Sequence, residues 1–225
     1  MGIPAFHKAM GVPFQLYAPY FCATSSYPSN FTMLRSNTKL PGCDSMDFYD
    51  AAPEDAVRFY EFLFDLGQSY GMTMFEPDFL NANHLCVPRF IEEVGAADAF
   101  FGGQTSVALA RGIPIQWCFC TPMLLMWTLN APAVSNFRVS YDFYYGGSWD
   151  IGRSSLIVWA MGSAPSKGTS FVKGRRGWGG GWRGGSRMAP RQAMYEPSRR
   201  HTCSTPTPIP PPPPPHPHPR HVLEQ

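Results

Sequence analysis

Asp78 and Asp142 are the two residues of this sequence best placed to carry out chemistry. Each follows a short apolar run that predicts a buried strand, Asp78 after 72–75 and Asp142 at the end of 134–142. Parallel strands collect such carboxylates at the mouth formed by their carboxyl ends. Two carboxylates facing one cleft can divide the cleavage of a glycosidic bond, since one attacks the anomeric carbon while the other protonates the leaving oxygen. On pattern alone, an aspartate at a strand end also serves as a helix cap or loop anchor.

The elements that must position these two carboxylates are predicted by an alternation of short apolar runs with helical patterns. This alternation is typical of strand-helix-strand units and a parallel sheet. The expected strands cover 12–20, 72–75, 113–120 and 134–142, and the expected helices cover 52–70, 87–97, 104–110, 123–129 and 150–161. The segment 24–50 is rich in Ser, Asn, Gly and Pro and predicts a long loop.

Four segments match, in order and in spacing, the motifs of a known enzyme clan. Arg138-Val139-Ser140-Tyr141-Asp142 fits the motif Arg-x-Ser-x-Asp in all three fixed positions, and Glu76-Pro77-Asp78 stands where the clan has Lys-x-Asp. The segment 53–60 is similar to the helix before that strand, and 113–119 matches a strand with a cysteine at the position of Cys118. The region 52–165 therefore resembles the retaining α-galactosidase and raffinose-synthase clan, which covers glycoside hydrolase families 27, 31 and 36.

The resemblance implies a (β/α)8 barrel with Asp78 as nucleophile and Asp142 as acid/base. It also implies a set of residues that bind the substrate. Two aromatic residues near the expected mouth, Trp117 and Trp149, are further candidates because their rings can stack on a sugar face. The expected substrate-binding residues are Glu76, Trp117, Cys118, Arg138, Ser140 and Trp149. Rings of this kind are also common in ordinary packing, so the stacking role and a core role are both open.

Glu76 departs from the clan's pattern because a lysine usually stands at this position. A lysine there binds substrate hydroxyls and keeps the nucleophile anionic, whereas a second carboxylate raises the pKa of one member of the pair. The resemblance therefore does not extend to galactose as the substrate.

The length and composition predict one domain followed by a tail. A (β/α)8 barrel needs about 200 to 250 residues, more than precede the change in composition near residue 171. The expected fold is α/β, a partial (β/α)8 TIM-barrel-like domain over 1–171 that is an incomplete barrel, with a disordered Gly/Arg/Pro-rich tail over 172–225. The tail holds nine Lys or Arg against two Glu, so the formal net charge of +2 averages two unlike parts and does not indicate a nucleic-acid partner.

Cysteine usage and the lack of further motifs argue against a disulfide-rich protein, a metalloprotein and a membrane protein. Six cysteines in 225 residues are too sparse for a disulfide framework, and Cys118 and Cys120 lie in an apolar run, so we expect buried free thiols. The sequence has no zinc-ligand spacing and no phosphate-binding loop, so no metal or cofactor is expected. No apolar run is long enough to span a membrane, and the first residues lack the core of a secretory signal, so no compartment is predicted.

Three functions follow from these features. The leading hypothesis is a retaining glycoside hydrolase or glycosyl-transfer enzyme that acts on an α-linked sugar with two carboxylates. The first alternative is a catalytically inactive sugar-binding or structural remnant of such a barrel, and the second is an interaction protein that acts through its Arg/Pro-rich tail. The expected partner is a carbohydrate, and the oligomeric state is not predicted.

Overall fold

The computed structural model describes residues 2–44, 46–118, 122–139 and 148–166. The predicted tail over 172–225 lies outside these residues, and so do Ser140 and Asp142. None of the described helices combines the length and the apolar character that a membrane span requires.

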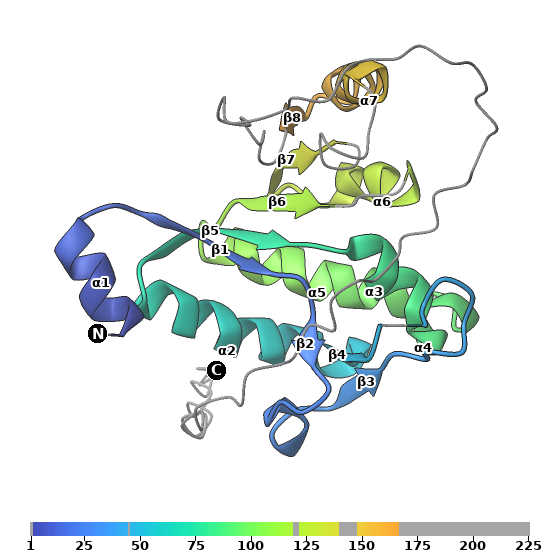
Figure 1. Ribbon diagram of the computed structural model, residues 1–225, viewed down its shortest axis with the longest axis horizontal. Coiled ribbons are helices and arrows are strands. Elements are labelled where there is room, and N and C mark those ends of the chain that lie inside the picture. Colours follow the sequence, from blue (N-terminus) through green and yellow to red (C-terminus); the bar gives the residue numbers. More distant parts are fainter. Residues whose placement is uncertain (1, 45, 119–121, 140–147, 167–225) are drawn as a thin grey trace, which may run out of the picture.

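A five-stranded parallel sheet forms the centre of the molecule (Figure 1). Its strands are β1 (Phe14–Ala18), β5 (Met72–Pro77), β6 (Ile115–Cys118), β7 (Val134–Arg138) and β8 (Ala164–Ser166), in the order β1-β5-β6-β7-β8. The alternation in the sequence therefore predicted the parallel sheet correctly, although β8 was not expected. The register places Tyr17 opposite Glu76 and Cys118 opposite Arg138. The carboxyl ends of four neighbouring strands are thus aligned along one edge.

Two helices, α2 (Ala56–Ser69) and α5 (Ala96–Ala110), cover one face of this sheet (Figure 1). The apolar side of α2 meets the sheet through Tyr60 and Phe64, whose ring centroids lie 6.4 and 5.1 Å from that of Phe75. Gly103 allows α5 to approach α2 closely, because a Cβ on Gly103 would lie 2.8 Å from the Cβ of Ala56. α5 thus includes the Gly102-Gly103 pair and begins earlier than the helix expected over 104–110.

The remaining helices are shorter, and they differ from expectation in three places. They are α1 (Ile3–Met10), α3 (Leu80–Cys86), α4 (Pro88–Glu92), α6 (Pro122–Trp127) and α7 (Ser148–Ala160), with 3-10 turns η1 (Tyr27–Ser29), η2 (Pro53–Asp55) and η3 (Thr128–Asn130). The single helix expected over 87–97 is wrong, since α4 ends at Glu92 and α5 begins at Ala96. Gly95 separates them with a φ of 83°, a left-handed conformation that glycine adopts without strain. Helices α1 and α3 were not predicted.

A second, antiparallel sheet takes two of its strands from the segment 24–50, where a continuous loop was expected, and that expectation was wrong for these strands. It comprises β2 (Phe21–Cys22), β4 (Phe48–Ala51) and β3 (Met33–Arg35), in the order β2-β4-β3. Phe48 and Ala51 are fully buried, so this small sheet contributes to the core. The Arg35 guanidinium also donates to both carboxylate oxygens of Asp47 at 2.9 Å.

A disulfide between Cys43 and Cys86 ties this segment to α3, with 5.7 Å between the two Cα atoms. The expectation of free thiols was wrong for this pair, because the fold brings together two cysteines that are 43 residues apart. Cys118, in contrast, is a buried free thiol as expected.

Candidate functional site

The two faces of β5 and β6 differ because side chains alternate along a strand. Phe75 and Trp117 point toward the helices, since Phe75 packs on Phe64 of α2 and Trp117 on Phe101 of α5. Glu76 and Cys118, each one position further along, therefore point to the opposite face. Arg138 shares that face because it is the register partner of Cys118.

On this face one guanidinium meets two carboxylates. Nη1 of Arg138 lies 3.6 Å from Oε1 of Glu76 and 3.5 Å from Oδ2 of Asp78. The three side chains are only 13%, 12% and 3% exposed, respectively. The burial of a charge costs free energy unless the charge is paired, and here each of the three groups has a partner of opposite charge. The structure thus brings together three of the residues that the sequence analysis selected.

Strand β1 contributes two polar side chains that the sequence analysis did not select. The Tyr17 hydroxyl donates to Oδ2 of Asp78 at 2.7 Å, and Nε2 of Gln15 donates to Oε2 of Glu76. Both residues occupy alternate positions of the run Phe14-Gln15-Leu16-Tyr17, in which apolar and polar residues take turns. That alternation is the sequence signal that could have indicated them.

The backbone after β5 is strained where it holds Asp78. Phe79 adopts φ 53° and ψ 34°, and it is the one residue other than glycine with a positive φ in the described part of the chain. This conformation costs an L-residue about 1 to 2 kcal/mol. The Phe79 N–H donates to Oδ1 of Asp78 at 2.7 Å, and the Asp78 N–H donates to the Ala18 carbonyl at 3.2 Å. Strain of this kind clusters at functional sites, which supports the choice of Asp78.

The protonation states in this cluster follow from burial. Burial is the largest cause that raises the pKa of the Tyr17 phenol, and the hydrogen bond to Asp78 adds to it. Burial likewise raises the pKa of the Cys118 thiol, followed by the negative charge of Asp78. Both groups therefore keep their protons at neutral pH. Burial also raises the pKa of Glu76, against the opposing effects of Gln15 and Arg138.

Of the predicted site residues not yet placed, Trp117 is the one with a described side chain. Trp117 is fully buried on the helix-facing side of the sheet, where its Nε1 donates to Oε1 of Gln104 at 3.3 Å. We correct its expected role in sugar stacking accordingly, because its position is that of a core side chain. Trp149 belongs to α7, but its side chain is outside the described part, as are Ser140 and Asp142.

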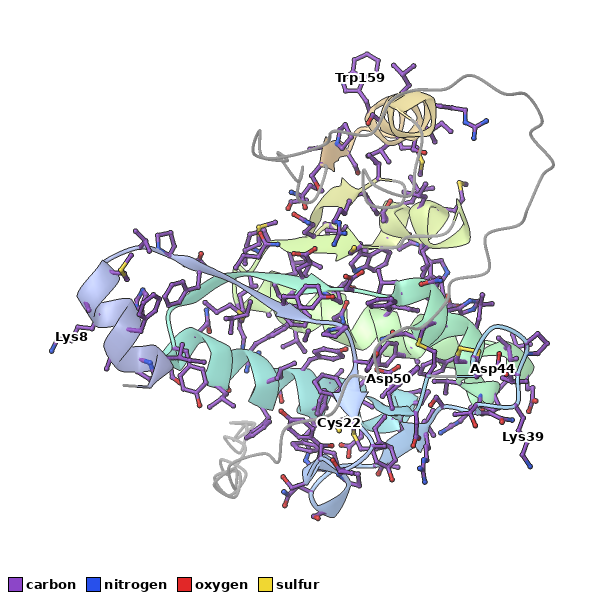
Figure 2. The ribbon with its side chains drawn as sticks, viewed as in Figure 1. Lys8, Cys22, Lys39, Asp44, Asp50 and Trp159 are labelled. Carbon is purple, nitrogen blue, oxygen red and sulfur yellow. A yellow bond between two sulfur atoms is a disulfide. The ribbon has the colours of Figure 1, made fainter. Side chains whose placement is uncertain are left out.

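The described residues contain no candidate metal centre, but they line two surface hollows. No group of three or more His, Cys, Asp or Glu side chains in the described ranges could hold a metal ion. One hollow lies against α7 and is lined by Leu156, Pro165 and Trp159, which points away from the helix (Figure 2). The other lies between α5 and α6. Both are distinct from the Glu76–Asp78–Arg138 cluster.

Comparison with known proteins yields only distant structural similarity. No model of a known protein family matches this sequence, and no curated protein sequence matches it either. Among solved structures, the chain is similar to TtGalA, an alpha-galactosidase from Thermus thermophilus determined in complex with stachyose, with a TM-score of 0.39 and 11% sequence identity. The similarity covers 73% of this chain and 48% of TtGalA, so the chain spans about half the length of that protein.

Proposed function

We propose that this protein is a retaining glycoside hydrolase, or a glycosyl-transfer enzyme of the same mechanism, that acts on an α-linked sugar. The observation that carries the proposal is the buried Asp78 carboxylate at the carboxyl end of β5, which Tyr17, the Phe79 N–H and Arg138 surround with donors. In this proposal the parallel sheet represents consecutive strands of a partial (β/α)8 barrel within residues 1–171.

Asp78 is the proposed nucleophile because its donors hold the carboxylate in a fixed orientation. One carboxylate oxygen forms a bond to the anomeric carbon while the bond from that carbon to the leaving oxygen breaks. A second carboxylic acid gives its proton to the leaving oxygen and later takes a proton from the water that releases the sugar. Net retention of configuration follows from these two displacements.

Asp142 is the proposed acid/base. It follows Arg138 by four residues, a span of at most about 14 Å of extended chain. The Arg138 guanidinium contacts Asp78, so the proposal requires the chain to turn back toward Asp78 within this span. Glu76, Arg138 and Ser140 are proposed to bind the hydroxyls of the sugar. Cys118 is proposed to line the site as a protonated thiol.

The contact between Glu76 and Arg138 favours a second candidate function, a sugar-binding protein without turnover. The same Nη1 that would meet a substrate hydroxyl already lies 3.6 Å from Glu76. If this ion pair persists when a sugar binds, the nucleophile would gain no help from Arg138 in the transition state. The interaction function of the tail remains a sequence-based prediction, because 172–225 lie outside the described residues.

Trapping of the covalent intermediate separates the two candidates. The protein would be incubated with 5-fluoro-α-galactosyl and 5-fluoro-α-glucosyl fluoride, and the adduct would be located by peptide mass spectrometry. We expect a glycosyl adduct on the peptide that contains Asp78, absent in Asp78→Asn and present in the control Asp65→Asn, whose carboxylate pairs with Arg111 at the surface. Sugar binding without any adduct would favour the second candidate, and an adduct on another carboxylate would refute the assignment of Asp78.

A further inference from the structure

A hollow of about 340 Å³ lies between α5 and α6, on the helix-covered side of the sheet. Its lining includes Asp98, Gly102 and Thr105 of α5, Trp127 of α6 and Asn130 of η3. The Glu76–Asp78–Arg138 cluster occupies the opposite face of the sheet. The hollow is therefore separate from the proposed catalytic centre.

The side chains around this hollow combine an aromatic ring with free hydrogen-bonding groups. Trp127 is half-buried, and its ring is held by the Phe101 ring at a centroid distance of 4.8 Å and an interplanar angle of 72°. Asp98 and Asn130 are exposed beside it, and Asp98 makes no ion pair with any described residue. Both oxygens of a carboxylate accept hydrogen bonds, and an amide both donates and accepts.

Gly102 is an independent indication that the hollow is kept open. A glycine inside a helix costs about 0.5 to 1 kcal/mol relative to alanine. Packing explains that cost for Gly103, whose added Cβ would collide with Ala56, but a Cβ on Gly102 would meet no atom within 4 Å. The helix thus lacks a side chain at a position where the fold has room for one, and this position borders the hollow.

We propose that this hollow is a second saccharide-binding site, which holds a neutral pyranose ring against Trp127. A pyranose has an apolar face that packs on an aromatic ring and a rim of hydroxyls that hydrogen-bond to carboxylate and amide groups. Asp98 and Asn130 supply those groups here, and Gly102 lets the sugar approach the helix. The proposal goes beyond the catalytic function and does not depend on turnover at Asp78.

The test uses fluorine NMR of the full chain labelled with 5-fluorotryptophan, in the Asp78→Asn background. The Trp127 resonance is assigned by its loss in Trp127→Phe. The probes are methyl α-glucoside, methyl α-galactoside, maltose and melibiose. We expect at least one of them to shift the Trp127 resonance with a dissociation constant in the millimolar range, typical of one small ligand on an exposed surface.

Two glycine variants determine where the sugar binds. Gly102→Met places a side chain into the hollow and should weaken the sugar-induced shift by about tenfold or more. Gly152→Met is the matched control, since Gly152 is also helical, also meets no atom within 4 Å, and borders the other hollow. It should leave the shift unchanged. Both variants should unfold at or above the temperature of the parent, because methionine favours helices more than glycine does.

Three results would overturn the proposal. The first is that none of the four sugars shifts the Trp127 resonance, and the second is that the shift survives Gly102→Met. The third is that tetramethylammonium, and not the sugars, shifts the resonance. That result would indicate a cation site between the aromatic rings and Asp98. The covalent-trapping experiment on the wild type is scored separately. Failure of one proposal is therefore distinguishable from failure of the other.

Discussion

The Arg138 guanidinium reaches across strand β6 to the Asp78 carboxylate, with 3.5 Å between Nη1 and Oδ2. β7 and β5 are two strand spacings apart, about 10 Å, and β6 lies between them. Cys118 ends β6 opposite Arg138 and is buried beside both charged groups. A small side chain at position 118 therefore leaves room for the arginine to span the sheet.

The first prediction tests this spatial requirement. Cys118→Leu should push the Arg138 side chain away from Asp78 and lower kcat/KM on an activated aryl α-glycoside by about tenfold or more. Overpacking should also cost about 1 to 3 kcal/mol of the free energy of unfolding, measured in urea. Cys118→Ala keeps the path open and should retain activity. Equal activity in the leucine and alanine variants would contradict this explanation of Cys118.

The second prediction concerns the donor on Asp78. Tyr17→Phe removes a hydroxyl that donates to a carboxylate only 3% exposed, and such a loss costs about 1.5 to 3 kcal/mol. If Tyr17 orients the nucleophile, kcat/KM should fall by about tenfold to a hundredfold while the secondary structure stays unchanged by circular dichroism. Tyr70→Phe removes a hydroxyl from the end of α2 and serves as the control. An unaltered kcat/KM in Tyr17→Phe would argue against a positioning role.

The sequence could predict those features of this site that local patterns encode. The apolar run before Glu76-Pro77-Asp78 specifies a buried strand, and a charged residue at its end requires polar partners. Arg138 was selected differently, through the motif Arg-x-Ser-x-Asp that the resemblance supplied. The alternation of strands and helices then favours a parallel sheet. Each helix carries the chain back to the end of the sheet where the previous strand began, so the next strand runs in the same direction.

The parts that could not be predicted depend on contacts between distant segments. Cys43 and Cys86 pair across 43 residues, and no local pattern specifies which cysteines meet. The face that Trp117 occupies is set by the strand register and by Phe101 of α5, so its aromatic character alone did not distinguish a sugar platform from a core ring. The antiparallel strands β2, β3 and β4 are only two to four residues long, too short to show a periodic pattern.

The third prediction concerns the pH dependence of stability through Glu76. Its pKa is raised in the folded state above the ordinary value of 4.5, mainly by burial. The folded protein therefore binds more protons than the unfolded chain between the two pKa values. The stabilisation from the protonated form is full below the unfolded pKa and is lost as the pH rises through the folded pKa.

Glu76→Gln should remove this contribution, so its free energy of unfolding should fall less between pH 4 and pH 7 than that of the wild type. Asp50 (Figure 2) is fully buried, and its pKa is also raised. Its contribution to stability therefore also decreases as the pH rises. Asp50→Asn should thus give a separate decrease in the pH slope, additive with Glu76→Gln if the two sites are independent. Urea unfolding at several pH values measures both slopes. A steeper slope in Glu76→Gln would show that the sign is wrong.

The last prediction concerns the disulfide that joins the antiparallel sheet to α3. A cross-link that closes a loop of 43 residues lowers the entropy of the unfolded chain and on that account stabilises the fold by about 4 kcal/mol. The double variant Cys43→Ala/Cys86→Ala should therefore unfold at a lower urea concentration. The parallel sheet does not include either cysteine, so the covalent adduct at Asp78 should still form under conditions in which the variant remains folded. Cys118→Ala is the control, since it removes a buried thiol that closes no loop. A double variant as stable as the wild type would show that the small sheet is held by its packed Phe48 and Ala51 and by the Arg35–Asp47 pair rather than by the cross-link.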